Sequence, residues 1–249
     1  MTPLNPERAT ADAAAAGAEV KREYVKQMFS EIAPFYDRVN RIVSFRIDQW
    51  WRKKAIGALE IGRDPEGQYL DLCAGTLDIA SQIGKQRGFR GRVIAADFAE
   101  PMLRAGLKKV SRSVVEPVTA DALALPFVGD FASGAIVVFG IRNVVDLDGA
   151  LREVHRVLRS SARFVILEFG VTQNPLVGWM YRLYFNHLCP LVGNAVAHHH
   201  SAYNYLPKSV QHFPKESELA RRMTEAGFES VHWRSFTFGV VALHVGEKP

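Results

Sequence analysis

The stretch from Gln68 to Asp97, QYLDLCAGTLDIASQIGKQRGFRGRVIAAD, decides the fold. An apolar run, QYLDLC, is followed by the short loop AGT, a helical period through Ile79 and Ile83, and a second apolar run, RVIAAD. This alternation of strand, loop, helix and strand is typical of a βαβ unit. It predicts that the two strands pair in parallel.

Three further apolar runs continue the pattern. They are VEPVT (115–119), GAIVVFG (134–140) and RFVILEFG (163–170), and the segment LDGALREVHRVLR between the last two has helical spacing. Because crossovers between parallel strands are right-handed, the pattern predicts an open doubly wound sheet. Near the end, SVHWRSFTFGVVALHVGEK (230–248) contains two strand-like runs around Gly239, which predict a closing antiparallel pair.

The N-terminal part is predicted to be helical. Apolar residues recur at three- and four-residue spacing from Arg22 to Ile32, and a second helix is expected from Phe45 to Leu59. The stretch between them, FYDRVNRIVS (35–44), is interpreted as a polar and aromatic joint. The predicted class is α/β: a Rossmann-like doubly wound sheet of about seven strands, mostly parallel with a C-terminal antiparallel strand, plus N-terminal helices in 21–62.

Length and composition favour one folded domain over residues 21–249, with residues 1–20 as a disordered or frayed tail. Of the 249 residues, 48% are hydrophobic and 23% are charged, which is the balance of a globular protein. A chain of this length buries roughly three quarters of its unfolded surface, so its core requires neither a disulfide nor a metal.

The cysteines and the net charge indicate the cellular compartment and limit the kinds of partner that we expect. Cys73 and Cys189 form no disulfide or metal-ligand spacing, which favours a reducing cytoplasm. The 31 Lys and Arg and 26 Asp and Glu leave a net charge of +5 without a basic stripe, so no nucleic-acid partner is expected. The most apolar stretch, 175–197, is interrupted by Arg182 and Pro190, so no membrane span is expected either.

Acidic residues and a glycine stand where the first strands of the predicted sheet end. In such sheets, ligands bind beyond the carboxyl ends of the strands. Gly75 allows close approach to the backbone, and the carboxylate of Asp97 can accept two hydrogen bonds from a ribose diol. Asp71 and Asp121 stand at neighbouring strand ends; taken singly, these residues are also read as a turn glycine and helix N-caps. Without the fingerprint GxGxxG, the pattern predicts a nucleotide-type site that is a poor fit to NAD.

Four segments resemble those of class I S-adenosylmethionine-dependent methyltransferases. They are DLCAGTLD (71–78), AADFAEPML (95–103), DALALPF (121–127) and FGIRNVVD (139–146). More narrowly, FGIRNV and AYNYLPKSVQHFP (202–214) resemble the quinone C-methyltransferase family of menaquinone and ubiquinone biosynthesis. FSEIAPFYDRVNRIVSF (29–45) and GVVALHVGEKP (239–249) are similar to the same family, so the resemblance runs from Val25 to the C-terminus.

The resemblance implies that the cofactor is S-adenosylmethionine and that each motif contacts a different part of it. The implied contacts are Gly75 and Thr76 with the methionine end, Asp97 with the ribose hydroxyls, Asp121 and Ala122 with the adenine, and Asp71 and Tyr36 beside them.

Two segments depart from the family pattern. The loop usually reads D-x-x-G-G-T-G-D, whereas Ala74 and Leu77 stand at two of its glycine positions, and Ser160-Ser161-Ala162 replaces a Pro-Gly-Gly turn before the fifth strand. Leu77 is tolerated if its dihedral angles are helical and strained if its φ is positive. We expect an active enzyme with a variant loop; the alternative is a loop that has lost the cofactor.

The implied reaction is methylation of a quinol ring carbon. It requires in-line approach to the methyl group and loss of a proton, which turns the ring into an enolate-like nucleophile. Arg142 is expected to stabilise the developing quinolate or to orient a water that accepts the proton, since a guanidinium is too basic to lose one. Asn143 would fix the geometry. Asp37 is a candidate proton acceptor, and ordinary packing at the helix joint is the alternative for Asp37 and Tyr36. A strand-end salt bridge with a turn cap is the alternative for Arg142 and Asn143.

The implied substrate is a polyprenyl quinol, either demethylmenaquinol or the methoxybenzoquinol of ubiquinone synthesis. Residues 171–215 are expected to form a helical cover, in which the apolar stripe from Leu176 to Leu188 holds the polyprenyl tail or docks on the inner face of the membrane. A homodimer is compatible with the sequence. His198, His199 and His200 cannot all face one ion, so no metal is expected.

Two other functions remain open at this point. One is methyl transfer to a different aromatic acceptor, because the acceptor-binding half of a methyltransferase varies most. The other is a non-catalytic quinone-binding protein that keeps the fold but has a degenerate cofactor loop. Binding of S-adenosylmethionine separates the second alternative from the enzymes.

Overall fold

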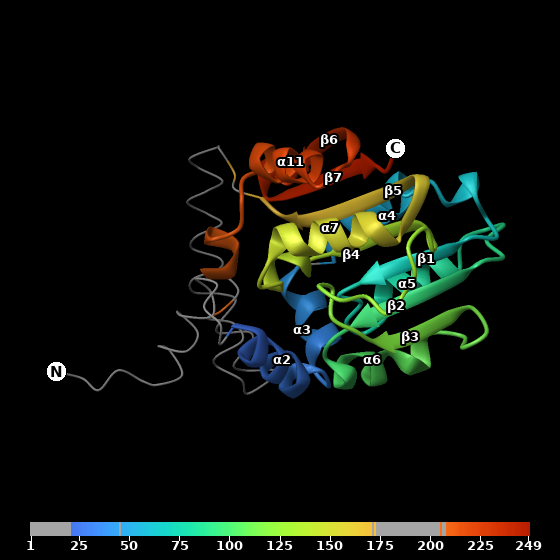
Figure 1. The fold of residues 1–249 in the computed structure, drawn as a ribbon. Helices are drawn as coiled ribbons and strands as arrows, with labels where there is room; N and C mark the ends of the chain where they lie inside the picture. The colour runs from blue at the N-terminus through green and yellow to red at the C-terminus, as the bar shows by residue number, and fades with distance from the viewer. Residues whose placement is uncertain (1–20, 45, 171, 173–204, 206–207) are drawn as a thin grey trace.

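A computed structural model of the chain describes residues 21–44, 46–170, 172, 205 and 208–249. Its centre is a seven-stranded sheet with the order β3-β2-β1-β4-β5-β7-β6 (Figure 1). The strands are β1 (Gln68–Leu72), β2 (Arg92–Asp97), β3 (Val115–Thr119), β4 (Ala132–Val138), β5 (Leu158–Phe169), β6 (Glu229–Phe236) and β7 (Val241–Glu247). β1 to β5 pair in parallel, and β7 pairs antiparallel with both β5 and β6.

Helices connect and cover these strands. The described α-helices are α2 (Lys21–Ile32), α3 (Tyr36–Val43), α4 (Asp48–Ala58), α5 (Asp78–Gly84), α6 (Glu100–Gly106), α7 (Leu147–Val157) and α11 (Glu216–Glu225). Single 3₁₀ turns are η1 (Ile61–Arg63), η2 (Leu107–Lys109), η3 (Ile141–Asn143) and η5 (Thr237–Gly239).

Each face of the sheet has its own core. On one face, Trp51 of α4 and Ile83 of α5 pack against strand residues such as Val93. On the other, Leu151 of α7 and Leu219 of α11 pack against the sheet, and Figure 1 shows α7 in front of the sheet with α4 behind it. Each fully buried aliphatic side chain contributes about 1.5–3 kcal/mol, so these two layers supply most of the folding free energy.

The parallel register aligns the strand ends that matter for function. Leu72 of β1 lies opposite Ala96 of β2 and Val137 of β4, and Val138 lies opposite Leu167 of β5. The residues that follow these positions therefore emerge together along one edge, which we call the carboxyl edge. Ligand sites in doubly wound sheets lie at this edge.

The structure confirms the predicted fold class and the closing antiparallel pair, and it corrects two local interpretations. Residues 35–44 are mostly the helix α3 rather than a joint, because Val39 packs with Val25 and Ile32 of α2. Tertiary burial thus stabilises a short helix that has no side-chain cap. Ser160-Ser161-Ala162 lies inside β5 rather than in a turn before it.

Several expectations concern residues outside the described part. They are the tail 1–20, the apolar stripe 176–188, most of the helical cover 171–215 and the histidines 198–200. Among the helices of the described residues, none has the length and apolar character needed to cross a membrane.

Ser161 carries a backbone conformation that favours glycine. Its φ is +62°, it is exposed, and its N–H donates to the Lys248 carbonyl oxygen at 2.8 Å. A left-handed conformation costs an L-residue roughly 1–2 kcal/mol, and glycine avoids this cost.

We expect Ser161→Gly to raise the free energy of unfolding by about 1 kcal/mol, because the strain disappears and the hydrogen bond to Lys248 is kept. This corresponds to a rise in Tm of about 2–4 °C for a chain of this size. Ser160→Gly is the matched control: Ser160 is also exposed but has no positive φ, so its replacement should lower Tm. Equal changes in the two variants would contradict this explanation.

Candidate active site

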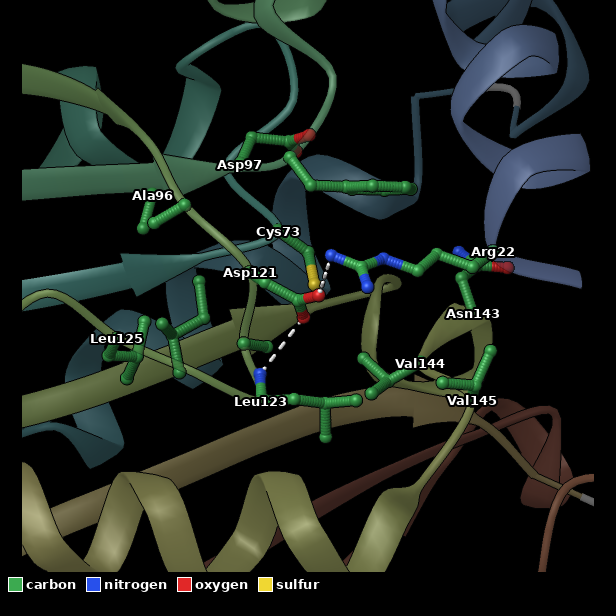
Figure 2. A pocket seen from close by; sticks show the side chains of 14 residues that line it. Arg22, Cys73, Ala96, Asp97, Asp121, Leu123, Leu125, Asn143, Val144 and Val145 are labelled. Atoms are coloured by element: carbon green, nitrogen blue, oxygen red, sulfur yellow. Dashed lines mark hydrogen bonds and ion pairs between the residues drawn. The ribbon is translucent and has the colours of Figure 1, made fainter. Parts of the chain in front are cut away.

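A pocket opens at the carboxyl edge between the ends of β1, β2 and β4 (Figure 2). It brings together four of the residues predicted for the site: Asp97, Asp121, Ala122 and Asn143. The other lining residues are Arg22, Leu72, Cys73, Ala96, Phe98, Ala120, Leu123, Leu125, Val144 and Val145. Mostly apolar walls with a few polar groups are typical of a pocket for a small organic ligand.

Asp97 holds the loop after β1 against the end of β2. One carboxylate oxygen accepts a hydrogen bond from the Gly75 N–H at 2.8 Å, and the other accepts from the Ala99 N–H at 2.8 Å. Burial raises the pKa of Asp97, and these hydrogen bonds work in the opposite direction. Each oxygen keeps a further lone pair, so the carboxylate can still accept hydrogen bonds from a diol in the pocket.

Glycine is required at position 75 for conformational reasons. Its φ is +53°, while a Cβ there would make only ordinary contact with Met102 at 3.4 Å. The left-handed conformation turns the loop so that its N–H reaches Asp97. The hydrogen bond thus joins two residues that were predicted for different parts of the cofactor.

Asp71 lies beneath the loop and does not line the pocket. Its side chain is fully buried, accepts a hydrogen bond from the Ala80 N–H at 2.9 Å, and so supports the first turn of α5. Burial raises the pKa of Asp71 to about 8.

Leu77 adopts the strained alternative, with φ +65° and ψ +23°. Its side chain is fully buried in the core of the sheet and is not among the residues that line the pocket. Gly106 makes room for it, since a Cβ at position 106 would lie 2.3 Å from the Thr76 carbonyl oxygen and 2.8 Å from the Leu77 Cγ. The departure from the family loop therefore changes the core beside the pocket rather than the pocket itself.

A polar cluster joins α3 to the cofactor loop. The Thr76 hydroxyl donates to the Asp37 carboxylate at 2.6 Å. The Lys109 ammonium forms ion pairs with Asp37 and, at 2.7 Å, with Asp78, and it donates to the Thr76 hydroxyl at 3.0 Å. Tyr36, next to Asp37, packs against Phe29, Ala99 and Met102 rather than lining the pocket. Burial raises the pKa of its hydroxyl.

The first turn of α2 closes over the pocket. Figure 2 shows the Arg22 side chain reaching across to Asp121, with 2.6 Å between the guanidinium and the carboxylate. The other oxygen of Asp121 accepts a hydrogen bond from the Leu123 N–H at 3.0 Å. The Lys21 ammonium donates to the carbonyl oxygens of Arg142 at 2.9 Å and Val144 at 3.0 Å. Burial, aided by Arg142, lowers the pKa of Lys21 to about 8.

Arg142 forms a buried ion pair with Glu168, at 2.8 Å, so the strand-end salt bridge foreseen as an alternative is present. Its guanidinium also donates to the Phe139 carbonyl oxygen at 2.6 Å and lies 5.4 Å from the centre of the Phe169 ring. Burial raises the pKa of Glu168, while Arg142 opposes the shift. Asn143, one residue on, faces the pocket.

Sequence reasoning missed Arg22, Lys109 and Glu168. Glu168 has a usable signal, because it is the one acidic residue in the apolar run RFVILEFG. Arg22 and Lys109 belong to no motif, and their partners lie far away in the sequence. Within the ranges that the structure describes, no three His, Cys, Asp or Glu side chains gather in a way that could hold a metal ion.

Comparisons with known proteins match nearly the whole chain. A model of the ubiE/COQ5 methyltransferase family matches residues 17–248. The demethylmenaquinone methyltransferase of Thermus thermophilus is 42% identical over 224 residues, covering 89% of this chain and all of the relative. The ubiquinone/menaquinone biosynthesis C-methyltransferase UbiE of Geobacter sulfurreducens is 37% identical, covering 92% of this chain and 90% of the relative.

Among solved structures, a SAM-dependent methyltransferase from Thermotoga maritima superimposes with a TM-score of 0.60 at 18% identity, covering 89% of this chain and all of that one. This likeness concerns the fold, whereas the family match and the two relatives span nearly the whole sequence. The chain belongs to the ubiE/COQ5 methyltransferase family and is an S-adenosylmethionine-dependent methyltransferase.

Proposed function

We propose that this methyltransferase acts on a ring carbon of a polyprenylated quinol, either demethylmenaquinol or the methoxybenzoquinol of ubiquinone synthesis. The observation that carries the proposal is the near full-length similarity to relatives named for these two pathways. Asn143 lines the pocket, and Arg142 precedes it in the chain with its guanidinium held by Glu168; both support the proposal, because a quinol acceptor requires polar groups for its hydroxyl.

The pocket fits the cofactor that the family uses. Asp97 keeps acceptor capacity for the ribose hydroxyls, and Asp121 and Ala122 line the wall proposed for the adenine. Gly75 and Thr76 are not among the residues that line the pocket, and we propose that they meet the methionine end from the loop beside it. Asp71 acts indirectly in this proposal, through the first turn of α5. Arg22 is expected to release Asp121 when the cofactor enters.

The chemistry then depends on how a proton is handled. The bound cofactor supplies an electrophilic methyl group on a sulfonium with a good leaving group. As the ring carbon bonds to the methyl group, the methyl–sulfur bond breaks; loss of the ring C–H proton restores aromaticity, so one proton is released per transfer. Arg142 is proposed to stabilise the quinolate and Asn143 to fix the ring.

Asp37 can accept a proton only after one of its present contacts breaks. Both of its oxygens are engaged, one by Thr76 and one by Lys109. A proton from the acceptor would therefore reach Asp37 only after one of these contacts breaks. A water oriented by Arg142 is the simpler acceptor, and Asp37 then serves to hold α3 against the cofactor loop.

The experiment that tests the function uses methyl-labelled S-adenosylmethionine and each of the two reduced quinols. Mass spectrometry should find the label on a ring carbon of one of them. If neither quinol is labelled while calorimetry shows cofactor binding, the acceptor is a different aromatic compound. If the cofactor does not bind, the chain is a quinone-binding protein without catalysis.

Two variants separate cofactor binding from turnover. Asp97→Ala should weaken cofactor binding by 100-fold or more, because it removes the ribose contacts and the tie to Gly75, each worth about 1–1.5 kcal/mol. Arg142→Ala should bind the cofactor as the wild type does and lose turnover. Calorimetry and the labelling assay measure the two effects, with circular dichroism as the test of folding. Equal binding and turnover in both variants would refute the assignment.

The cluster around Lys109 predicts a link between α3 and the cofactor loop. Lys109→Met leaves Asp37 and Asp78 without their shared cation, so α3 should exchange its amide hydrogens faster and cofactor affinity should fall about tenfold, or 1.4 kcal/mol. Lys108→Met is the matched control, since Lys108 is exposed and has no ion pair among the described residues. The same exchange in both variants would show that the cluster is not a link.

We also propose peripheral contact with the inner face of the membrane, in a cytoplasmic protein. Exposed apolar side chains and exposed cations occur on α3, on the turn before α4, on α4 and on η5. We propose that they form one surface, the apolar-basic patch: Ile42, Ile47, Trp50 and Phe238 with Arg38, Arg41, Arg46, Lys53 and Lys54. The Trp51 indole N–H donates to Thr237 at 3.0 Å, which joins α4 to η5 beside the end of β5. We propose that a lipid-borne quinol enters from the side of this patch.

Binding to vesicles of anionic phospholipid tests this contact. The double variant Trp50→Ser with Phe238→Ser should lose most vesicle binding, because each aromatic ring contributes about 1.5–3 kcal/mol on burial. Val128→Ser is the matched control, as Val128 is equally exposed, at 73%, but lies outside the patch. Unchanged binding in the double variant would exclude the patch. Light scattering on the protein without vesicles measures whether it forms the homodimer with which the sequence is compatible.

A further inference from the structure

Three buried polar atoms in the region of η3 and α2 have no hydrogen-bond partner. They are Arg142 Nε, Asn143 Oδ1 and the Tyr205 hydroxyl. Buried polar groups are nearly always paired, and each one left unpaired costs about 1–3 kcal/mol. In the described part of the chain only His155 and His244 have a similar atom, and both belong to other regions. Arg142 and Asn143 are consecutive residues, and the charge of Arg142 acts on the Tyr205 hydroxyl, so the three unpaired atoms belong to one region.

Tyr205 is fixed in position by the N-terminal helices. Its side chain is 2% exposed and packs with Val25 and Met28 of α2 and with Val39 of α3. Its ring lies 5.8 Å from that of Tyr24. Burial raises the pKa of the hydroxyl far above its ordinary value, and the charge of Arg142 acts against this shift. The hydroxyl is therefore protonated at neutral pH and able to donate.

Glu168 determines which edge of the guanidinium is available. One oxygen of Glu168 accepts from the terminal nitrogen of Arg142 at 2.8 Å and from the Phe169 N–H at 2.9 Å. The same terminal nitrogen donates to the Phe139 carbonyl oxygen. These contacts hold the guanidinium and leave its Nε–H as an unused donor. Asn143 follows Arg142 in the chain and lines the cofactor pocket, so the unused donor lies next to a residue of the pocket wall.

We infer that Tyr205, Arg142 and Asn143 form a subsite for one phenolic hydroxyl, the one next to the ring carbon that receives the methyl group. The inference rests on the proposed function and deepens it. Asn143 Oδ1 first accepts a hydrogen bond from the phenolic hydroxyl. The hydroxyl proton then passes to a water that Arg142 orients, while the Tyr205 hydroxyl and the Arg142 Nε–H donate hydrogen bonds to the phenolic oxygen. Glu168 is a positioning residue that acts through Arg142.

This arrangement resembles an oxyanion hole in its physics. Two fixed donors in a water-poor site stabilise a developing negative charge, and removing one such donor typically costs about 100- to 1,000-fold in rate. It also explains why the protein leaves these polar atoms unpaired: the hydroxyl of the substrate would be their partner. Such a site discriminates strongly against a ring without a hydroxyl, because its polar groups then stay unpaired. Ordered water is the competing explanation for the unpaired atoms.

Tyr205→Phe in the full-length chain tests the subsite. We expect kcat to fall about 100-fold, cofactor affinity to stay within twofold, and the acidic limb of the pH–rate profile to move to higher pH, because the bound phenol ionises less readily. Tyr69→Phe is the matched control: the Tyr69 hydroxyl is also buried, donating to the Asp64 carbonyl oxygen at 2.9 Å, but far from the pocket. It should lower Tm without moving the profile. If both variants behave alike, water explains the unpaired atoms and the subsite is wrong.

Glu168→Gln should give the opposite shift. Removing its negative charge leaves Arg142 more able to stabilise a phenolate, so the acidic limb should move to lower pH while kcat falls because the guanidinium is less well held. A purely structural role for Glu168 would lower Tm and leave the profile in place. Shifts of the same sign in Glu168→Gln and Tyr205→Phe would also overturn the inference.

A chromophoric phenol separates this inference from the proposed function. The absorbance of 4-nitrophenol reports its ionisation, and the wild-type protein should lower its apparent pKa more than Tyr205→Phe does. If the wild type ionises the probe but labels neither quinol, the proposed function fails and the subsite stands. If Tyr205→Phe labels the quinol at the wild-type rate, the subsite fails and the proposed function stands.

Discussion

The parallel alignment of β1, β2, β4 and β5 is the constraint on which the site depends. It brings the loops that follow these four strands to one edge, where the chain turns away from the sheet within a few residues. Cys73, Leu77 and Phe139 adopt left-handed backbone conformations there, with φ of +52°, +65° and +57°. Each costs about 1–3 kcal/mol and is tolerated because the strands on either side fix the backbone. Of these three residues only Cys73 lines the pocket, so the strain at this edge lies mostly in the backbone beside the pocket.

Three carboxylates at this edge are buried, and each one has a hydrogen-bond or ion-pair partner. Asp71 and Asp97 accept hydrogen bonds from backbone N–H groups, and Glu168 has the guanidinium of Arg142. Replacing such a pair by apolar residues often leaves stability unchanged or raises it, so the pair is poor evidence for stability. Its value lies in what it orients. The edge is therefore organised for binding and catalysis at the expense of an apolar interior.

The sequence predicted the elements whose evidence is local. β2 and β3 begin and end where the apolar runs RVIAAD and VEPVT do, because buried parallel strands read as continuous apolar stretches. Asp97 and Asp121 line the pocket, as expected for residues at strand ends, while their contacts with the cofactor stay a prediction. α3, Arg22 and Lys109 could not be found in this way. Lys109 meets Asp37 across a separation that no periodicity spans, and α3 depends on packing against α2.

β7 comes last along the sequence but lies between β5 and β6 in the sheet. During synthesis, the edge of β5 therefore stays unpaired until residues 241–247 have been made, and β6 has no strand to join before then. Contacts over such long separations form slowly, and an open strand edge invites association with other chains. The order of the strands thus makes the nascent chain depend on prompt completion, or on a chaperone that covers β5, before a working enzyme can exist.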